Sequence, residues 1–189
     1  MKDLNSSSDI TSSASLNPSV IFSSSVQKLS IFQFESEGNL SKDNSFIFPS
    51  VSNQDLKGSW MLFLSGKFLY ELLSNNKLKE YTSENVKVFL LTNDNKLLGY
   101  CIFTDKDEID LPYLKPWIGF LYIFPEYRGK RYSSLLIQHC ENYARNIGYN
   151  KIYISTNHEN LYEKYGFTLY KENIINIYGS YSKIYIKKL

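Results

Sequence analysis

Hydrophobic and polar residues alternate in several short stretches of this chain, and this alternation predicts strands. Residues 29–34 alternate well enough for a first strand, and two runs rich in β-branched and aromatic residues cover 86–91 and 97–103. The polar loop 93–96 joins these two runs, and its Asn and Asp residues tolerate the left-handed conformations of tight turns. The pattern therefore predicts a first strand and, later in the chain, a β-hairpin.

Helical spacing governs two other stretches. In 54–82, leucines recur at helical spacing with Lys and Glu between them, and Gly66 is the expected break between two helices. Residues 132–147 carry one apolar stripe, and Gly148 suits the C-terminal cap of that helix. The stripe consists of Tyr132, Leu135, Leu136, His139, Tyr143, Ala144 and Ile147.

Two apolar runs flank the second helical stretch. The unbroken run 117–124 is typical of a strand covered on both faces, and 151–156 is the next strand. The strand–helix–strand order implies parallel pairing. Residues 161–165 are expected to form a short helix, and 167–170 with 182–187 a closing antiparallel pair. The predicted class is α/β or α+β with a mixed sheet.

Composition divides the chain into a tail and one domain. Residues 1–25 are rich in serine and predict a flexible tail, which leaves 26–189 as a single domain. The net charge of +2 lacks the basic excess of nucleic-acid-binding proteins, and no apolar run approaches the roughly 18 residues of a membrane span. Cys101 and Cys140 cannot build a disulfide framework, so a cytoplasmic location is expected.

Positive charge gathers where the apolar strand meets the second helix. Arg128, Lys130 and Arg131 surround Gly129 just before that helix begins. The first turn of a helix has N–H donors without intrahelical acceptors, which favour phosphate, and Gly129 lets a ligand approach the backbone. The segment is consistent with a pyrophosphate site, or with a basic loop that caps a helix.

Two motifs of this region resemble a known superfamily. The run FPEYRGKRYSSLL (124–136) resembles the acetyl-CoA signature of the GNAT-type N-acetyltransferases, Arg/Gln-x-x-Gly-x-Gly/Ala after a strand that ends in Pro. The run LYEKYGF (161–167) resembles the superfamily's Leu-Tyr-Glu-Lys-x-Gly-Phe segment. The sequence departs from the signature at Arg131, where a Gly is usual, and carries Ser133 where Gly or Ala is usual.

The resemblance implies a fold and a binding site. The fold is a mixed, mostly antiparallel sheet with helices on both faces and splayed parallel fourth and fifth strands. The backbone of the central strand would pair with the pantetheine arm of acetyl-CoA, and the turn after it would hold the pyrophosphate. The implied acetyl-CoA contacts are Leu121, Tyr122, Ile123, Arg128, Gly129, Lys130, Arg131, Tyr132, Ser133, Ser134 and Asn157. Tyr162 matches the residue that donates a proton to the departing thiolate, with plain packing as its alternative role, and no metal is implied.

The implied activity is transfer of the acetyl group of acetyl-CoA to a primary amine, expected to be a small molecule. Direct attack in a ternary complex is expected, because no Cys lies where a covalent acyl intermediate would form. The protein is expected to be a monomer or homodimer that binds neither nucleic acid nor membrane. A CoA-binding regulatory module without transferase activity is the alternative, and transfer from a longer thioester is a further one.

The general base is the open part of this hypothesis. The central strand carries no carboxylate, and Glu108, Asp110 and Glu126 are expected to be solvated surface charges. His158 is a candidate proton relay or substrate contact, and His139 is expected to be a core histidine. The acidic loop 105–110 would suit a cationic acceptor.

Overall fold

The computed structural model describes residues 19–21, 29–35, 64–93 and 96–189. The strands are β1 (Ser19–Ile21), β2 (Leu29–Glu35), β3 (Lys87–Asn93), β4 (Lys96–Thr104), β5 (Trp117–Ile123), β6 (Lys151–Thr156), β7 (Thr168–Ile175) and β8 (Tyr181–Lys188). The α-helices are α2 (Leu64–Ser74), α3 (Leu78–Tyr81) and α4 (Tyr132–Asn146). Two 3-10 helices, η1 (Pro125–Tyr127) and η2 (Tyr162–Tyr165), complete the described elements.

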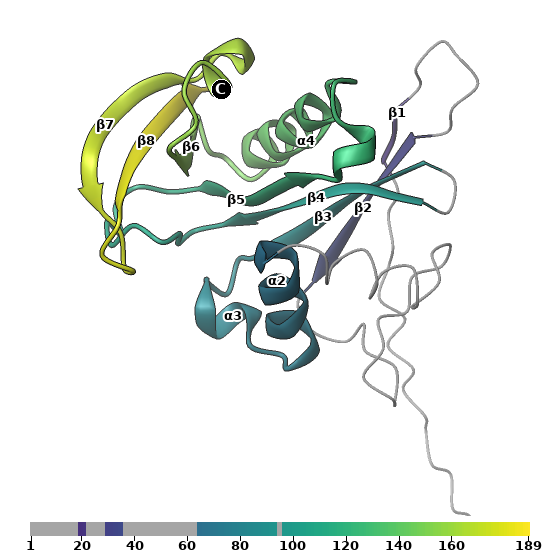
Figure 1. Cartoon of the computed structure of the whole chain (residues 1–189), viewed down its shortest axis with the longest axis horizontal. Coiled ribbons are helices and arrows are strands. Elements are labelled where there is room, and N and C mark those ends of the chain that lie inside the picture. Colours follow the sequence, from purple (N-terminus) through teal and green to yellow (C-terminus); the bar gives the residue numbers. More distant parts are fainter. Residues whose placement is uncertain (1–18, 22–28, 36–63, 94–95) are drawn as a thin grey trace, which may run out of the picture.

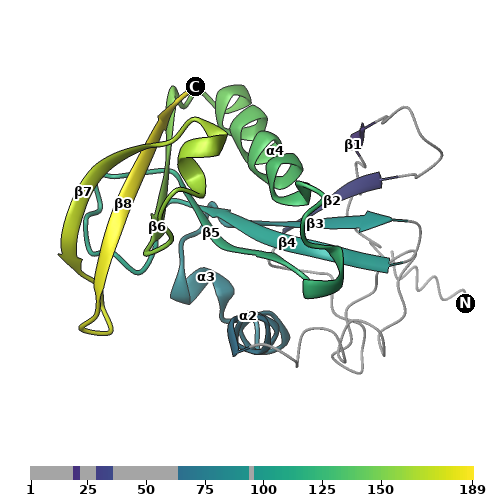
Figure 2. The ribbon, with the colours of Figure 1, turned by 45° about the horizontal axis from the view of Figure 1, so that its top comes forward.

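The strands form one mixed sheet in the order β1-β2-β3-β4-β5-β6-β8-β7. Every neighbouring pair is antiparallel except β5 and β6, which are parallel. Helix α4 covers one face, and α2 and α3 cover the other (Figure 1, Figure 2). The predicted mixed, mostly antiparallel sheet with helices on both faces is therefore confirmed.

The parallel strands β5 and β6 touch only near their beginnings. Trp117 and Tyr153 are their one register pair, and the N–H of Tyr153 donates to the carbonyl of Pro116 at 2.9 Å. The rings of Trp117 and Tyr153 pack with centroids 5.4 Å apart, which anchors this end. Because β6 then diverges, it does not pair with Leu121–Ile123. The splay that the resemblance implies is present.

The centre of the sheet has a core on each face. Along β3, Phe89 and Leu91 belong to the core under α4, whereas Val88 and Leu90 belong to the core under α2 and α3. A strand covered on both faces reads as a continuous apolar run, which explains why the hairpin β3–β4 is predictable from sequence. Cys101 and Cys140 are buried free thiols in the core under α4, with their Sγ atoms 3.5 Å apart.

The break between the first two helices lies later than the sequence predicts. Gly66 lies inside α2, so the break predicted there is wrong. The chain turns between α2 and α3, where Asn76 has a φ of 55°. Gly inside a helix costs only about 1 kcal/mol relative to Ala, whereas Asn readily takes the left-handed conformation that ends a helix. The part of the predicted stretch before Leu64 lies outside the described residues.

Two details of the second half also differ from the prediction. The buried stripe of α4 includes Ile137 and Cys140, whereas Ile147 follows the helix and is 47% exposed. Strand β5 is buried only over its first three residues, and its other residues are half-buried. The prediction that both faces of 117–124 are covered holds only for that first part, because the second part borders a pocket.

The remaining predictions concern the N-terminal segment and the ends of the domain. Within 1–25, Ser19–Ile21 form β1 and pair with β2, and the other residues of that segment lie outside the described residues. The closing pair β7–β8 is present, and Gly148 has the left-handed φ of 92° expected of a C-terminal cap. None of the helices in the described ranges has the length and apolar character that a membrane span requires.

Candidate active site

A pocket of about 1050 Å³ lies where the end of β5, the start of α4 and η2 meet. The splay of β5 from β6 leaves room for it, because β6 does not cover the second half of β5. The predicted acetyl-CoA contacts that line it are Leu121, Tyr122, Ile123, Arg128, Gly129, Arg131, Tyr132, Ser133 and Ser134. Two motifs that are far apart in sequence, 124–136 and 161–167, therefore border one cavity.

The N-terminus of α4 has backbone N–H groups that are available to bind an anion. Arg131 is the N-cap and has left-handed angles, φ 59° and ψ 25°. No side chain of the described residues caps the first turn, and the hydroxyl of Ser134 donates instead to the carbonyl of Arg131 at 2.7 Å. Gly129 has a φ of 81° and open space where a Cβ would lie. The N–H of Ser134 donates to the carbonyl of Arg131 at 3.0 Å, whereas those of Tyr132 and Ser133 have no intrahelical acceptor, so they suit a pyrophosphate.

The side chains of Arg128 and Ser133 fix this turn to the rest of the pocket. Arg128 Nε donates to the carbonyl of Ile123 at 3.0 Å, and its guanidinium lies 5.3 Å from the centre of the Tyr122 ring. The hydroxyls of Ser133 and Tyr165 are 2.6 Å apart, which joins the start of α4 to η2. The sequence indicates Tyr165 only as a core residue, since no local pattern connects it with a serine of another element.

Tyr162 lies in η2 with only 7% of its surface exposed. Its ring packs near those of Phe167 and Tyr165, with centroids 6.1 and 6.4 Å away. Burial raises its pKa to about 12, nearby Tyr165 and Cys101 add to the rise, and a hydrogen bond with the Thr156 side chain opposes it. The phenol is therefore protonated throughout the physiological range and can act as a proton donor, not as a base.

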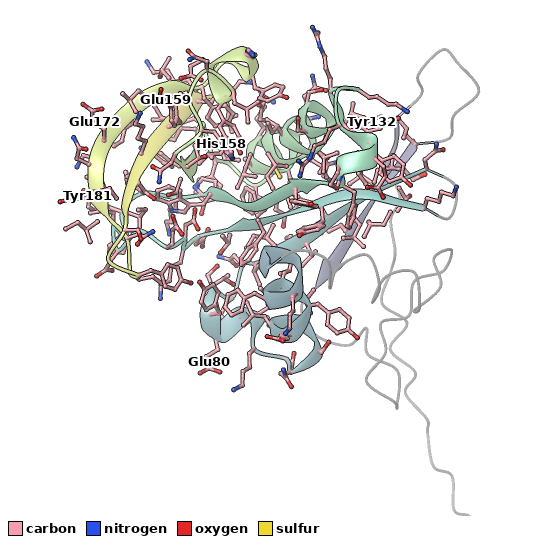
Figure 3. The ribbon with its side chains drawn as sticks, in the orientation of Figure 1. Glu80, Tyr132, His158, Glu159, Glu172 and Tyr181 are labelled. Carbon is pink, nitrogen blue, oxygen red and sulfur yellow. The ribbon has the colours of Figure 1, made fainter. Side chains whose placement is uncertain are left out.

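Some residues singled out from the sequence lie elsewhere. Lys130 is exposed and does not line the pocket, and Asn157 donates from Nδ2 to the carbonyl of Tyr181 at 2.8 Å. His158 is exposed but borders the pocket, and Figure 3 shows it between α4 and β8, far from Tyr132. His139 is half-buried, packs edge-on against Phe89 with centroids 4.6 Å apart, and has its pKa lowered by burial.

A second pocket of about 760 Å³ adjoins the first and shares Leu121, His158 and Tyr162 with it. It lies on the side of α2 and α3, and its wall includes Phe120, which has a φ of 51°. The register of β4 with β5 shifts opposite this residue, between Tyr100 and Ile102, so β5 is bulged here. The bulge lies where the two pockets meet.

The second pocket also contains two carboxylates from the loop after β4, in addition to Glu71 of α2. Glu108 Oε1 accepts hydrogen bonds from the hydroxyls of Ser155 and Ser182, both at 3.1 Å, so the prediction that Glu108 is a solvated surface charge is wrong. Asp107 lies next to it, and burial raises its pKa to about 7. Asp110 and Glu126 are exposed, as expected. The sequence shows Asp107 only as one of several acids in a loop, because its burial depends on residues from distant parts of the chain.

Comparison with solved structures shows the same fold in other proteins. A GNAT family acetyltransferase from Elizabethkingia anophelis with acetyl-CoA bound is 14% identical, with a TM-score of 0.55 over 85% of this chain and 98% of that one. An IAA acetyltransferase from Bacillus cereus is 14% identical, with a TM-score of 0.53 over 86% and 100%. These identities show a shared fold alone.

Another solved structure matches a smaller part of the chain. A Bacillus anthracis protein described as a streptothricin acetyltransferase, in complex with acetyl coenzyme A, is 16% identical with a TM-score of 0.46. The match covers 56% of this chain and 63% of that one. A search of curated protein sequences found no match.

The sequence itself matches a family model. The model describes the acetyltransferase (GNAT) family and matches residues 55–167, which is more than half of the chain. The matched range includes β5 and η2, which border both pockets, and α4, which borders the first. The chain belongs to the GNAT acetyltransferase family.

Proposed function

We propose that this protein transfers the acetyl group of acetyl-CoA to a small primary amine by direct attack in a ternary complex. The observation that carries the proposal is the junction of the two pockets at Leu121, His158 and Tyr162. One pocket has the donors that a pyrophosphate needs, and the other has carboxylates that suit a cationic amine. A thioester and an amine that enter from the two sides meet beside Tyr162.

Acetyl-CoA fits the first pocket on two grounds. The edge of β5 at Leu121–Ile123 is not paired with β6, so its backbone groups can pair with the amides of the pantetheine arm as an added strand would. The first turn of α4 and the guanidinium of Arg131 then lie at the pyrophosphate end. The binding contacts at Lys130 and Asn157 stay predictions.

The residues near the junction support direct transfer. Cys101 and Cys140 are buried and line neither pocket, and burial raises the pKa of the Cys140 thiol, so these residues are poor nucleophiles. Tyr162 is protonated and can donate to the sulfur as the C–S bond breaks. The acceptor then has to arrive as, or become, a neutral amine before it attacks the carbonyl carbon.

Calorimetry with acetyl-CoA tests the binding half of this proposal. We expect a dissociation constant of tens of micromolar or tighter, because charge-assisted contacts to phosphate combine with pairing along β5. Release of free CoA thiol in the presence of amines tests the transfer half. Absence of binding would contradict the proposal, and binding without thiol release for any amine would favour a regulatory module that only binds CoA.

Arg131 allows a finer prediction about the pyrophosphate end. Arg131→Gly is expected to change the free energy of unfolding by less than about 1 kcal/mol, because relief of the left-handed strain offsets the entropy of glycine. The same change is expected to raise the dissociation constant for acetyl-CoA about 3- to 10-fold, since it removes one charged contact worth about 1 kcal/mol. Thermal melting and calorimetry at two salt concentrations measure the two effects.

A matched control separates local contact from overall charge. Lys188 is exposed and does not line the pocket, so Lys188→Ala removes one positive charge elsewhere on the protein. We expect its effect on acetyl-CoA affinity to stay below twofold. An equal loss in both variants would show that Arg131 acts only through the net charge.

A further inference from the structure

The second pocket has an aromatic wall at one end. The ring of Phe68 lies 5.0 Å from that of Tyr81 in an edge-to-face arrangement and 6.1 Å from that of Phe120. The hydroxyl of Tyr81 hydrogen-bonds that of Tyr178, which joins α3 to the turn between β7 and β8. Three rings from α2, α3 and β5 thus form a surface that suits an apolar or aromatic group.

Asp107 and Glu108, the two carboxylates from the loop after β4, have different hydrogen-bond partners. Glu108 accepts two hydroxyl hydrogen bonds through Oε1, and its carbonyl accepts the N–H of Ile177 at 2.9 Å. Asp107 Oδ1 accepts the N–H of Glu108 at 2.9 Å, and within the described part of the chain its Oδ2 receives no hydrogen bond. Each carboxylate therefore keeps one oxygen, Glu108 Oε2 and Asp107 Oδ2, that receives no hydrogen bond within the described residues, but only Glu108 is held in place by two side-chain hydroxyls.

Asp107 lies against the strand that carries the junction. Its Oδ1 is 3.8 Å from the point where a Cβ on Gly119 would lie, and Gly119 directly precedes the bulge at Phe120. Because residue 119 has no side chain, nothing from that position stands between the carboxylate and β5. Burial raises the pKa of Asp107 to about 7, so at neutral pH a large fraction is available as a base.

Besides Asp107, the charged side chains that line the pocket are Lys67, Glu71, Lys106 and Glu108. Lys67 and Glu71 of α2 lie 3.8 Å apart with both side chains about half exposed, and Lys106 and His158 are exposed. Tyr81, Tyr162 and Tyr178 are the remaining titratable groups that line it, and burial raises the pKa of Tyr81 and of Tyr162. Asp107 Oδ2 is thus available to an ammonium, and Lys67 and Lys106 repel a second positive charge that comes near them.

We propose that Asp107 binds the ammonium group of the acceptor and takes its proton, and that the acceptor is a monocationic primary amine with an aromatic or branched apolar body. The body lies on the rings of Phe68, Tyr81 and Phe120, and the amine points toward the junction beside Tyr162. This inference rests on the proposed acetyl transfer and adds the substrate class and the base.

Asp107 accepts one proton from R–NH3+ and passes it to solvent, which leaves R–NH2 with a free electron pair. That pair forms the C–N bond, the C–S bond breaks, and Tyr162 gives its proton to the departing sulfur. The nitrogen loses its second proton, which restores the Tyr162 phenol through solvent. The products are the N-acetyl amine, CoA thiol and one proton released to solvent.

The test compares Asp107→Asn with Asp110→Asn in the full-length protein, with 2-phenylethylamine and spermidine as acceptors. Asn keeps the Oδ1 that accepts the Glu108 N–H, and Asp110 is an exposed acid of the same loop that does not line the pocket. Wild-type protein is expected to prefer 2-phenylethylamine at least 10-fold in kcat/KM. Asp107→Asn is expected to lower that value about 100-fold, Asp107→Glu to recover part of it, and Asp110→Asn to change it less than twofold.

The pH profile and acetyl-CoA binding distinguish a base from a structural residue. In wild-type protein kcat/KM is expected to rise with pH and level off above about 7, the pKa of Asp107, whereas in Asp107→Asn it rises through pH 9 with the fraction of free amine. Acetyl-CoA affinity, measured by calorimetry, is expected to change less than twofold. An Asp107→Asn protein within threefold of wild type with the same profile, or equal use of spermidine, would overturn the inference and leave the acetyl transfer intact. Absence of thiol release with both amines would refute both.

Discussion

Replacing Tyr162 with phenylalanine is expected to lower the rate of acetyl transfer about 100-fold or more, the usual effect of losing a positioned proton donor. The change removes only the hydroxyl, so the packing of the ring near Phe167 and Tyr165 is retained. Acetyl-CoA affinity is therefore expected to stay within about threefold of wild type. Steady-state rates from thiol release, together with calorimetry, measure the two quantities.

The raised pKa of Tyr162 makes this prediction more specific. A phenol with a pKa of about 12 would have to give its proton to a thiolate whose conjugate acid has a pKa near 8.5, which costs about 5 kcal/mol for complete transfer. We therefore expect Tyr162 to donate as the C–S bond breaks and negative charge grows on sulfur. Because the group is protonated up to about pH 12, it is not expected to produce an alkaline limb in the pH profile.

Tyr165 supplies the control for this substitution. It lies in the same 3-10 helix, and its hydroxyl hydrogen-bonds Ser133 at 2.6 Å. Tyr165→Phe is expected to cost about 1 kcal/mol of stability and a few-fold in rate, because it removes one hydrogen bond and no reacting group. If Tyr162→Phe and Tyr165→Phe lowered the rate by the same small factor, the assignment of Tyr162 as proton donor would be wrong.

Local patterns explain most of the fold that could be predicted. Strand β5, helix α4 and strand β6 follow one another with clear changes in apolar period, and Gly148 marks the end of the helix. The splay between the parallel strands β5 and β6 could be expected only from the resemblance to the GNAT superfamily, since no local sequence pattern predicts it. The misplaced helix break shows the limit of such patterns, because Gly66 is tolerated inside α2 whereas Asn76 turns the chain.

The candidate site also has one part that could be predicted from the sequence and one part that could not. The turn 128–134, where we propose that the pyrophosphate binds, is one continuous segment, so its residues could be proposed together from the sequence. The second pocket combines residues of α2, α3, the loop after β4 and the turn between β7 and β8. Ser155 and Ser182, which lie far along the chain, hydrogen-bond the carboxylate of Glu108 and not that of Asp107. Such distinctions arise only from tertiary packing.

Among the substitutions considered, removal of Lys187 from its ion pair with Glu141 is expected to cause the largest loss of stability. Lys187 Nζ lies 2.6 Å from Glu141 Oε1, and the carboxylate side chain is only 6% exposed. Lys187→Met leaves that carboxylate buried with Arg145 as its nearest remaining cation, at 3.9 Å and 45% exposed. We expect a loss of about 3 kcal/mol in the free energy of unfolding, the lower end of the usual range, because Lys187 retains some contact with water.

Urea denaturation at pH 7 measures this loss, and two further variants test its cause. Glu141→Met combined with Lys187→Met is expected to recover most of the stability, because it removes the unpaired buried charge and keeps the volume. Lys67→Met breaks a pair whose side chains are 52% and 53% exposed, so it is expected to cost no more than about 0.5 kcal/mol. Equal losses in Lys187→Met and Lys67→Met would show that burial of Glu141 carries no penalty.

The same ion pair also supports the candidate site. Lys187 Nζ lies 5.8 Å from the centre of the Phe167 ring, and Lys187 Cε is 3.3 Å from the point where a Cβ on Gly166 would lie. The segment that carries Tyr162 therefore packs on the side chain that neutralises Glu141 of α4. Loss of Lys187 is expected to lower the rate of acetyl transfer as well as the stability. The double Met variant separates the two effects, because it is expected to restore the fold without restoring the cation beside Phe167.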